Sequence, residues 1–415
     1  MRKMKDSGIE WIGNIPKHWN VHPLYYYLGE RKNKNIFGNE RNLLSLSYGN
    51  VIRKDIDSNG SLLPESFNTY NIVEKGDIII RPTDLQNDKK SLRTGLVKEH
   101  GIITSAYIAL KALKNINVEY MHYLLHAFDI MKVFYNMGNG VRQGLSYSEF
   151  SQLQIFEPPI YEQKRIADYL DIKCAEFDSV ISDILSQIEI LEEYKRSVIT
   201  EAVTKGLNSD VEMKDSNVAW IGEIPKHWIC QRGKYILHYL QKPIADNDGV
   251  ITCFRDGEVT LRSNRREDGF TVADKEIGYQ GIDKGDLVVH GMDGFAGAIG
   301  ISDSRGKASP VLNVLDTEQN KRYIMYYLRS MAYNDVFVAM ATGIRVRSCD
   351  LRWNKLAELF YPIPPVEEQK HIVAYIDSII EQTNAIISEK KQQIATIEEY
   401  KKSLIFEYVT GKKEI

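Results

Sequence analysis

Cysteine, long apolar runs and an excess of either charge are all scarce in this chain of 415 residues. The four cysteines are scattered without a Cys-x-x-Cys pair, which argues against a disulfide framework or zinc site and fits a reducing cytoplasm. No stretch approaches the roughly 18 uninterrupted apolar residues of a membrane span, and the first residues lack the apolar segment of a secretory signal. With 53 basic against 56 acidic residues, the net charge of −3 gives no sign of nucleic-acid binding. The composition is that of a globular protein with two or three domains.

The chain contains an internal repeat of about 206 residues. Three pairs of segments carry it: DSGIEWIGNIPKHW (6–19) with DSNVAWIGEIPKHW (215–228), PPIYEQKRIADYLD (158–171) with PPVEEQKHIVAYID (364–377), and LEEYKRSVITEAVT (191–204) with IEEYKKSLIFEYVT (397–410). The stretches between these copies have diverged almost completely. One duplicated two-part unit therefore predicts a globular block at 1–157, a helix at 158–206, a second block at 207–363 and a second helix at 364–415.

Both constant segments carry an apolar heptad seam about five heptads long, which predicts coiled-coil packing of one helix on the other. At about 1.5 Å per residue, residues 162–205 would make a rod of about 65 Å. We expect two mixed α/β domains joined by two long antiparallel helices (an α+β/α fold class), with pseudo-two-fold internal symmetry; bundle helices inside one globular domain are the alternative. The predicted seam comprises Leu170, Phe177, Ile181, Ile184, Ile188, Leu191, Ile376, Ile380, Ile387, Ile394, Ile397 and Leu404.

The sequence offers no catalytic constellation. Glu157-Pro158-Pro159-Ile160-Tyr161 is a poor match to the Asp/Asn-Pro-Pro-Tyr/Phe motif of adenine methyltransferases, and its recurrence at Pro364-Pro365 indicates the start of a helix instead. The glycine-rich stretch 300–308 has the wrong spacing for a phosphate-binding loop. We predict no metal site from the nine histidines.

The repeated openings WIGNIPKHW and WIGEIPKHW, the PP-x-x-EQK helix starts and the LEEYK and IEEYK helix ends resemble those of the specificity subunit of type I restriction–modification systems. The resemblance covers essentially the whole chain. It implies a non-catalytic subunit whose variable blocks recognise the two halves of a split sequence in double-stranded DNA. It also implies binding to two modification (methyltransferase) subunits and, through them, to restriction subunits, with no membrane involved. No cofactor is expected in this chain; S-adenosylmethionine, ATP and Mg²⁺ belong to the partner subunits.

The charge is distributed unevenly between the segments. The helix at 158–206 has a net charge of −4 and block 1–157 has +4, so the acidity lies in the helices. Even so, the excess is small for a protein that holds DNA unaided, where several phosphate contacts are usual. We infer that a more basic partner protein provides part of the DNA contacts. A self-sufficient methyltransferase and a coiled-coil DNA-binding scaffold without sequence preference are the competing functions.

Candidate DNA contacts follow from the donors that base readout requires, Arg or Lys for guanine and Asn or Gln for adenine. One polar run follows an apolar strand in the first block, a second cluster lies in the second block, and solvated loops are the alternative for both. The repeated Gly-Val-Arg-Gln and Gly-Ile-Arg-Val-Arg segments favour phosphate contacts, because a shared task suits residues present in both halves. For the repeated Trp11, Trp19, Trp220 and Trp228 we favour packing over base stacking. The candidates are Arg81, Gln86, Asn87, Lys89, Lys90 and Arg93; Arg255, Arg262, Asn264, Arg265 and Arg266; and Arg142, Gln143, Arg345 and Arg347.

Overall fold

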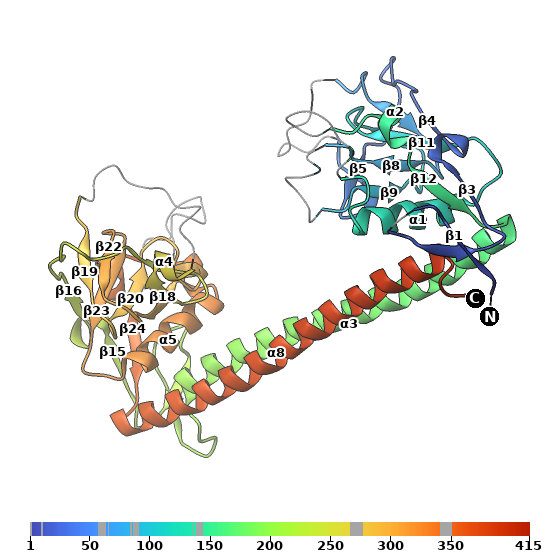
Figure 1. Ribbon diagram of the computed structural model, residues 1–415. Helices are drawn as coiled ribbons and strands as arrows, with labels where there is room; N and C mark the ends of the chain where they lie inside the picture. Colours follow the sequence, from blue (N-terminus) through green and yellow to red (C-terminus); the bar gives the residue numbers. More distant parts are fainter. Residues whose placement is uncertain are drawn as a thin grey trace. The chain divides into compact units, whose positions relative to one another are not determined.

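The computed structural model describes residues 2–9, 11–56, 64, 66–83, 85, 91–135, 137, 144–265, 277–340 and 351–415. The chain divides into two compact units (Figure 1). Unit 1 comprises Met1–Ile184 together with Lys391–Ile415, and unit 2 comprises Leu185–Lys390. Each unit is a mixed α/β structure, as the sequence predicted.

Unit 1 is built on a four-stranded antiparallel sheet in the order β4–β11–β8–β9. Strand β8 is fully buried and presents Ile78 and Ile80 to one face and Ile79 to the other. Ile78 and Ile80 belong to the main core with helix α1, whereas Ile79 packs in a smaller core beneath the neighbouring hairpins. The bounds are β4 Leu28–Glu30, β8 Ile78–Ile80, β9 Thr94–Leu96, β11 Ile108–Ala112 and α1 Val118–Ile130.

Two-stranded antiparallel pairs complete unit 1. They are β1 (Met4–Asp6) with β2 (Asn14–Pro16), β3 (Asn20–Pro23) with β12 (Gln154–Glu157), β5 (Leu44–Ser47) with β6 (Asn50–Arg53), and β7 (Asn71–Val73) with β10 (Gly101–Ile103). Short helices η1 (Leu24–Tyr26) and α2 (Tyr147–Phe150) connect them. Strand β12, which ends just before the first long helix begins, pairs with β3, the strand that directly follows the repeated opening segment.

Unit 2 repeats this strand order. Its four-stranded sheet is β16–β23–β20–β21, and its helix α5 corresponds to α1. The sheet and helix bounds are β16 His238–Leu240, β20 Leu287–His290, β21 Ile299–Ile301, β23 Leu312–Asp316 and α5 Lys321–Tyr333. The paired strands are β13 Met213–Asp215 with β14 Glu223–Pro225, β15 Ile229–Arg232 with β24 Phe360–Ile363, β17 Ile251–Cys253 with β18 Val259–Leu261, and β19 Gln280–Ile282 with β22 Gly306–Ala308. The short helices are η2 Gly233–Tyr235, α4 Arg262–Arg265, η3 Gly294–Ala296, α6 Val336–Ala339 and α7 Trp353–Leu356.

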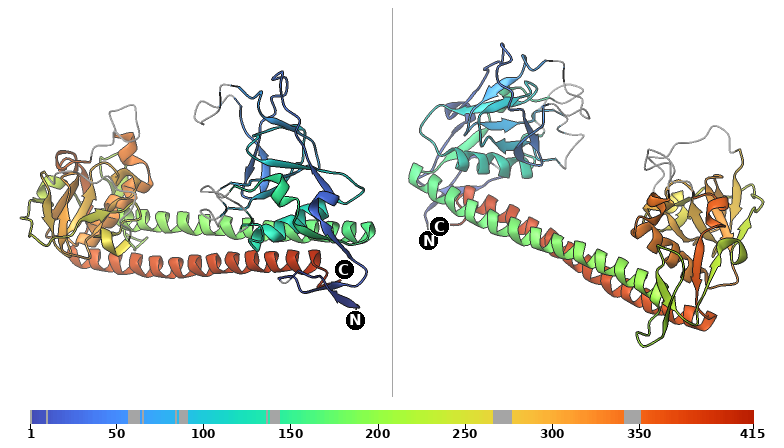
Figure 2. Two further views of the ribbon diagram at one scale, coloured as in Figure 1. Left: turned by 45° about the horizontal axis from the view of Figure 1, so that its top comes forward. Right: turned by 180° about the vertical axis from the view of Figure 1, so that it is seen from behind.

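Two long helices, α3 (Ile160–Lys205) and α8 (Val366–Val409), each begin in one unit and end in the other. Within each unit they lie side by side and antiparallel (Figure 2). In unit 1, the rings of Phe177 and Tyr400 lie 5.5 Å apart and those of Tyr169 and Tyr408 lie 4.7 Å apart. In unit 2, Lys195 donates to Asn384 at 3.0 Å, and Lys390 donates to Gln187 at 2.5 Å.

The predicted seam residues all lie in the interior or at its edge. Leu170, Ile184, Ile376, Ile387 and Leu404 are buried. The others, Phe177, Ile181, Ile188, Leu191, Ile380, Ile394 and Ile397, are half-buried.

Candidate nucleic-acid interface

The repeated opening segment of each unit is fastened to the start of a long helix. In unit 1, Trp19 Nε1 donates to Glu162 Oε2 at 3.0 Å, and His18 Nε2 bonds to the other carboxylate oxygen at 2.5 Å. In unit 2, Glu368 accepts from Trp228 Nε1 at 3.0 Å and bonds to His227 Nε2 at 2.8 Å. Trp19 and Trp228 are fully buried, so these repeated tryptophans hold the fold together.

The glutamine that follows each of these glutamates bonds to the residue that caps the start of α1 in unit 1 and of α5 in unit 2. Gln163 accepts from the Asn117 backbone N–H at 2.9 Å and donates to the Pro158 carbonyl at 2.8 Å. Gln369 repeats both bonds with Asn320 and Pro364, each at 2.9 Å. The paired prolines are thus the structural start of each long helix.

Repeated Lys-Gly-Asp segments form a locked turn before the central strand of each sheet. Asp77 accepts from the Glu74 backbone N–H at 2.8 Å and pairs with Arg31, although burial raises the pKa of its carboxyl. In unit 2, Asp286 accepts from the Asp283 N–H at 2.8 Å and pairs with Lys242 at 2.6 Å.

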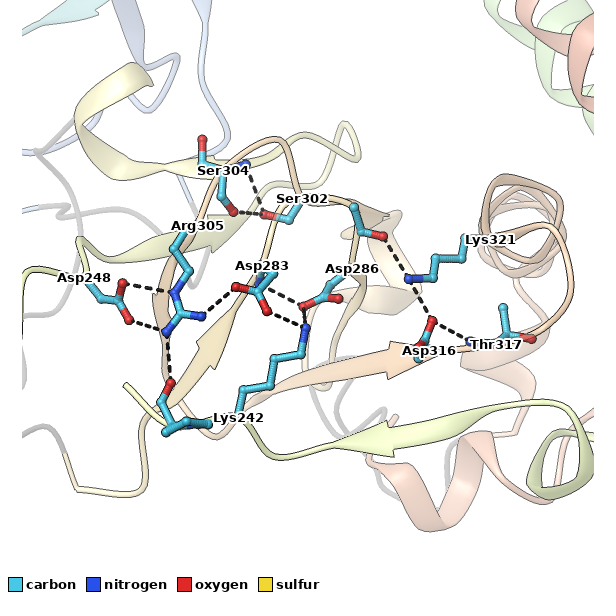
Figure 3. A network of polar contacts seen from close by, with 12 residues as sticks. Lys242, Asp248, Asp283, Asp286, Ser302, Ser304, Arg305, Asp316, Thr317 and Lys321 are labelled. Atoms are coloured by element: carbon cyan, nitrogen blue, oxygen red, sulfur yellow. Dashed lines mark hydrogen bonds and ion pairs between the residues drawn. The ribbon is translucent and has the colours of Figure 1, made fainter. Parts of the chain in front are cut away.

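Further charged contacts brace the same region of unit 2 (Figure 3). Arg305 bridges Asp248 and Asp283, while Lys242 also pairs with Asp283. Because Asp248 and Asp286 are each only 6% exposed, we assign this network to the scaffold and not to a DNA-contacting surface.

The predicted contacts of unit 2 gather on the hairpin β17–β18 and on the short helix α4 behind it. Arg255 pairs with Asp293 at 2.9 Å, and Arg265 pairs with Asp256 at 2.7 Å and with Glu258 at 2.8 Å. Exposed pairs of this kind contribute little to stability, so such arginines can exchange their partner for DNA at small cost. Arg262 Nε donates to Thr252 Oγ1 and Asn264 Nδ2 to Thr260 Oγ1, each at 2.9 Å.

In unit 1 the predicted polar run is split between the surface and the interior. Arg81 directly follows β8 and is half-buried. Arg93 is fully buried: its guanidinium donates to the Thr83 carbonyl at 2.5 Å and lies over the Tyr135 ring, so it is not presented to solvent. The remaining candidates, Gln86, Asn87, Lys89, Lys90, Arg142, Gln143, Arg266, Arg345 and Arg347, lie outside the described residues.

In the part of the chain that the structure describes, no group of three or more His, Cys, Asp or Glu side chains is placed to hold a metal ion. Over those same residues, no helix is both long enough and apolar enough to cross a membrane. Cys174, Cys230 and Cys253 are free thiols.

Part of the chain matches a known protein family. A family model described as the type I restriction modification DNA specificity domain matches residues 279–396. The chain is similar to type I specificity subunits. Two similar proteins of Methanocaldococcus jannaschii are named as specificity subunits of the type I restriction enzymes MjaX and MjaVIII. The MjaX protein is 24% identical over 318 residues, covering 74% of this chain and 70% of the relative; the MjaVIII protein is 25% identical over 350 residues, covering 75% and 74%.

A solved structure, titled as the structural basis of complex assembly and conformational transition of the type I R-M system, contains a chain of similar fold. It aligns with a TM-score of 0.66 at 15% identity and covers 96% of this chain and 99% of that chain. At that identity the likeness concerns the fold alone.

Two features of the chain were not predicted from its sequence. The hairpin β5–β6 of unit 1 has the same place in the strand order as β17–β18, yet no candidate was assigned to it. The signal in the sequence that could have pointed to this hairpin is the divergence between the two copies of the repeat there. The second feature is the pair His122 and His126 on α1, whose ring centroids lie 5.8 Å apart. Their His-x-x-x-His spacing is visible in the sequence, and no role was predicted from it.

Replacing Glu368 by alanine should destabilise unit 2 by about 1–3 kcal/mol, because the buried Trp228 indole loses its acceptor. Glu367→Ala is the matched control. Its side chain is 76% exposed and pairs with Lys370, so its effect should stay within about 0.5 kcal/mol. Urea unfolding followed by tryptophan fluorescence measures both, and equal losses would contradict the role of Glu368.

Proposed function

We propose that this protein is the DNA sequence-specificity subunit of a type I restriction–modification complex. It recognises an asymmetric bipartite DNA target and positions the methyltransferase and restriction subunits. One target-recognition domain, residues 1–157, reads one half-site, and the second, residues 207–363, reads the other. The observation that carries this proposal is that the two units share one strand order but differ at the hairpins: the turn of β5–β6 has two residues, and that of β17–β18 has five.

The repeated helices, residues 158–206 and 364–415, act as the spacer between the two readers. Support comes from the antiparallel contacts of α3 with α8 inside each unit and from the repeated strand order, which suits a pseudo-two-fold coiled-coil arrangement. A spacer of fixed length would hold the gap between the two half-sites constant, and the DNA sequence inside that gap would not matter. Dimeric DNA-binding proteins set the spacing of their half-sites by geometry in the same way.

The chain supplies recognition and leaves catalysis to its partners. Two methyltransferase subunits bind it and bring restriction subunits with them, and S-adenosylmethionine, ATP and Mg²⁺ act in those partners. The small positive excess of residues 1–157 supports this division, because a partner must provide part of the phosphate contacts.

Mapping N6-methyladenine in genomic DNA, with and without this gene, tests the proposal. The expected result is a motif of two unlike halves separated by a gap of one length, lost when the gene is deleted. A continuous motif, or one that tolerates gaps of several lengths, would overturn the proposal. Binding without sequence preference would instead favour a DNA-binding scaffold.

Arg142 and Arg345, repeated in both halves, are proposed to contact phosphates. Arg345→Ala should weaken binding of every duplex similarly and lower the slope of log K against log salt by about 0.9. Titrations of the assembled complex at several salt concentrations measure that slope. A change in which base pairs are preferred would show that Arg345 reads sequence.

A further inference from the structure

The hairpin β5–β6 of unit 1 ends in an unusual turn. Ser47 pairs with Asn50, so Tyr48 and Gly49 form a two-residue tip. Both have positive φ, 46° for Tyr48 and 80° for Gly49, which is typical of a type I′ turn. Asparagine is preferred at the first of these positions, whereas a bulky aromatic side chain is strained there. Such strain concentrates at functional positions.

Packing inside unit 1 does not account for the tyrosine. Its side chain is 85% exposed, while Gly49 beside it is buried against Leu92. A Cβ atom on Gly49 would come within 2.9 Å of Leu92 Cδ1. The contact explains the glycine and places the tip beside Leu92, the neighbour of Arg93 in the chain. The strained ring itself faces solvent.

The strand behind the tip also presents side chains suited to DNA. Asn50, Ile52 and Lys54 alternate along β6 and its end, and all three are exposed. A two-stranded β-ribbon is one of the elements that the major groove of DNA admits, and an asparagine amide can bond to the N6 and N7 edge of adenine. The ribbon thus carries an aromatic tip, an amide and a cation on one accessible element.

Comparison of the two copies of the repeat distinguishes surfaces that would bind the same partner from surfaces that would read different half-sites. A partner present in two copies should meet residues that recur in both units, whereas readers of unlike half-sites should differ. The hairpin β17–β18 has the same place in unit 2, but its tip is Phe254–Glu258 and exposes Arg255. Tyr48 has no counterpart in that turn.

We propose that the β5–β6 ribbon enters the target DNA with Tyr48 at its tip, and that Tyr48 is a specificity determinant for the half-site read by unit 1. This inference rests on the proposed function. It assigns the second half-site to the β17–β18 turn, where Arg255 takes the corresponding place.

Tyr48→Asn tests this in the complex assembled with methyltransferase subunits, because asparagine suits the positive φ. Its melting temperature should equal or exceed that of the wild type. Affinity for a duplex carrying the mapped motif should fall at least tenfold, with under twofold loss for an unrelated duplex. Methylation mapping should show relaxed preference in one half of the motif only.

Phe37→Asn is the control, since Phe37 is 86% exposed on a different turn of the same unit. It should leave affinity and motif unchanged. An unchanged affinity in Tyr48→Asn, or an equal loss in both variants, would overturn the role of Tyr48 while leaving the proposed function intact. A wild-type complex without sequence preference would instead remove the proposed function and this inference with it.

Discussion

A chain that ends after Lys390 should keep a folded unit 2 and lose the folded state of unit 1. Unit 2 is complete at that residue, whereas the core of unit 1 includes Leu404, Ile405, Tyr408 and Val409. The buried Tyr120 hydroxyl also donates to the Val409 carbonyl at 3.0 Å. Each large apolar side chain removed from a core costs about 2–5 kcal/mol, and a domain has only about 5–15 kcal/mol in total.

Limited proteolysis with mass spectrometry measures this outcome. Fragments from residues 1–157 should appear rapidly in the truncated chain, while residues 207–363 stay protected. Leu404→Ala in the full chain should produce a milder form of the same defect, and Glu398→Ala, on the exposed side of α8, should produce none. Equal protection of both units in the truncated chain would contradict the placement of residues 404–409 in the core of unit 1.

Acidification should weaken unit 1 through two histidines of α1. Burial is the main cause that lowers the pKa of His122 to about 3 and of His126 to about 4; the cation Lys98 adds to this at His122, and Lys401 and Lys132 add to it at His126. An unfolded histidine takes up a proton near pH 6.5, so only the unfolded state gains protons between pH 6.5 and about 4. Stability is therefore complete above pH 6.5 and falls as the pH drops, by about 2 kcal/mol per histidine at pH 5.

Unfolding of unit 1 at pH 8 and at pH 5 measures the effect, with hydrogen exchange to separate the units. The double variant His122→Gln/His126→Gln should lose most of the difference. His371→Gln is the control, because that imidazole is exposed on α8. In unit 2, burial also lowers the pKa of His290, so some acid sensitivity of that unit is expected as well. A double variant with wild-type pH dependence would refute the assignment.

The repeat made much of this fold predictable. Segments that recur 206 residues apart around divergent blocks indicated the helices now seen as α3 and α8, and the apolar run at 78–80 indicated the strand β8. The sequence could not indicate which side chains, far apart along the chain, pack together in one core. Arg93 reads as a surface cation at the end of a polar run, yet its backbone N–H bonds to Asp129 and its guanidinium lies over Tyr135.

The residues that we propose for base reading were the least predictable part. Arginines clustered along the chain pointed to the hairpin β17–β18, because local clustering is visible in sequence. The hairpin β5–β6 has no such cluster, and its turn Tyr48–Gly49 lacks the usual Asn-Gly signal. Only the shared strand order of the two units links one hairpin to the other.

Part of the interior of unit 1 comes from residues that follow unit 2 in the sequence. This sets the order in which the units fold during protein synthesis. Residues 1–184 leave the ribosome first but must wait for residues 391–411, so unit 2 can finish folding earlier. Until then, the apolar surface around Tyr120 that α8 later covers is open to chaperones and proteases. The half of the protein made first is therefore the last to mature.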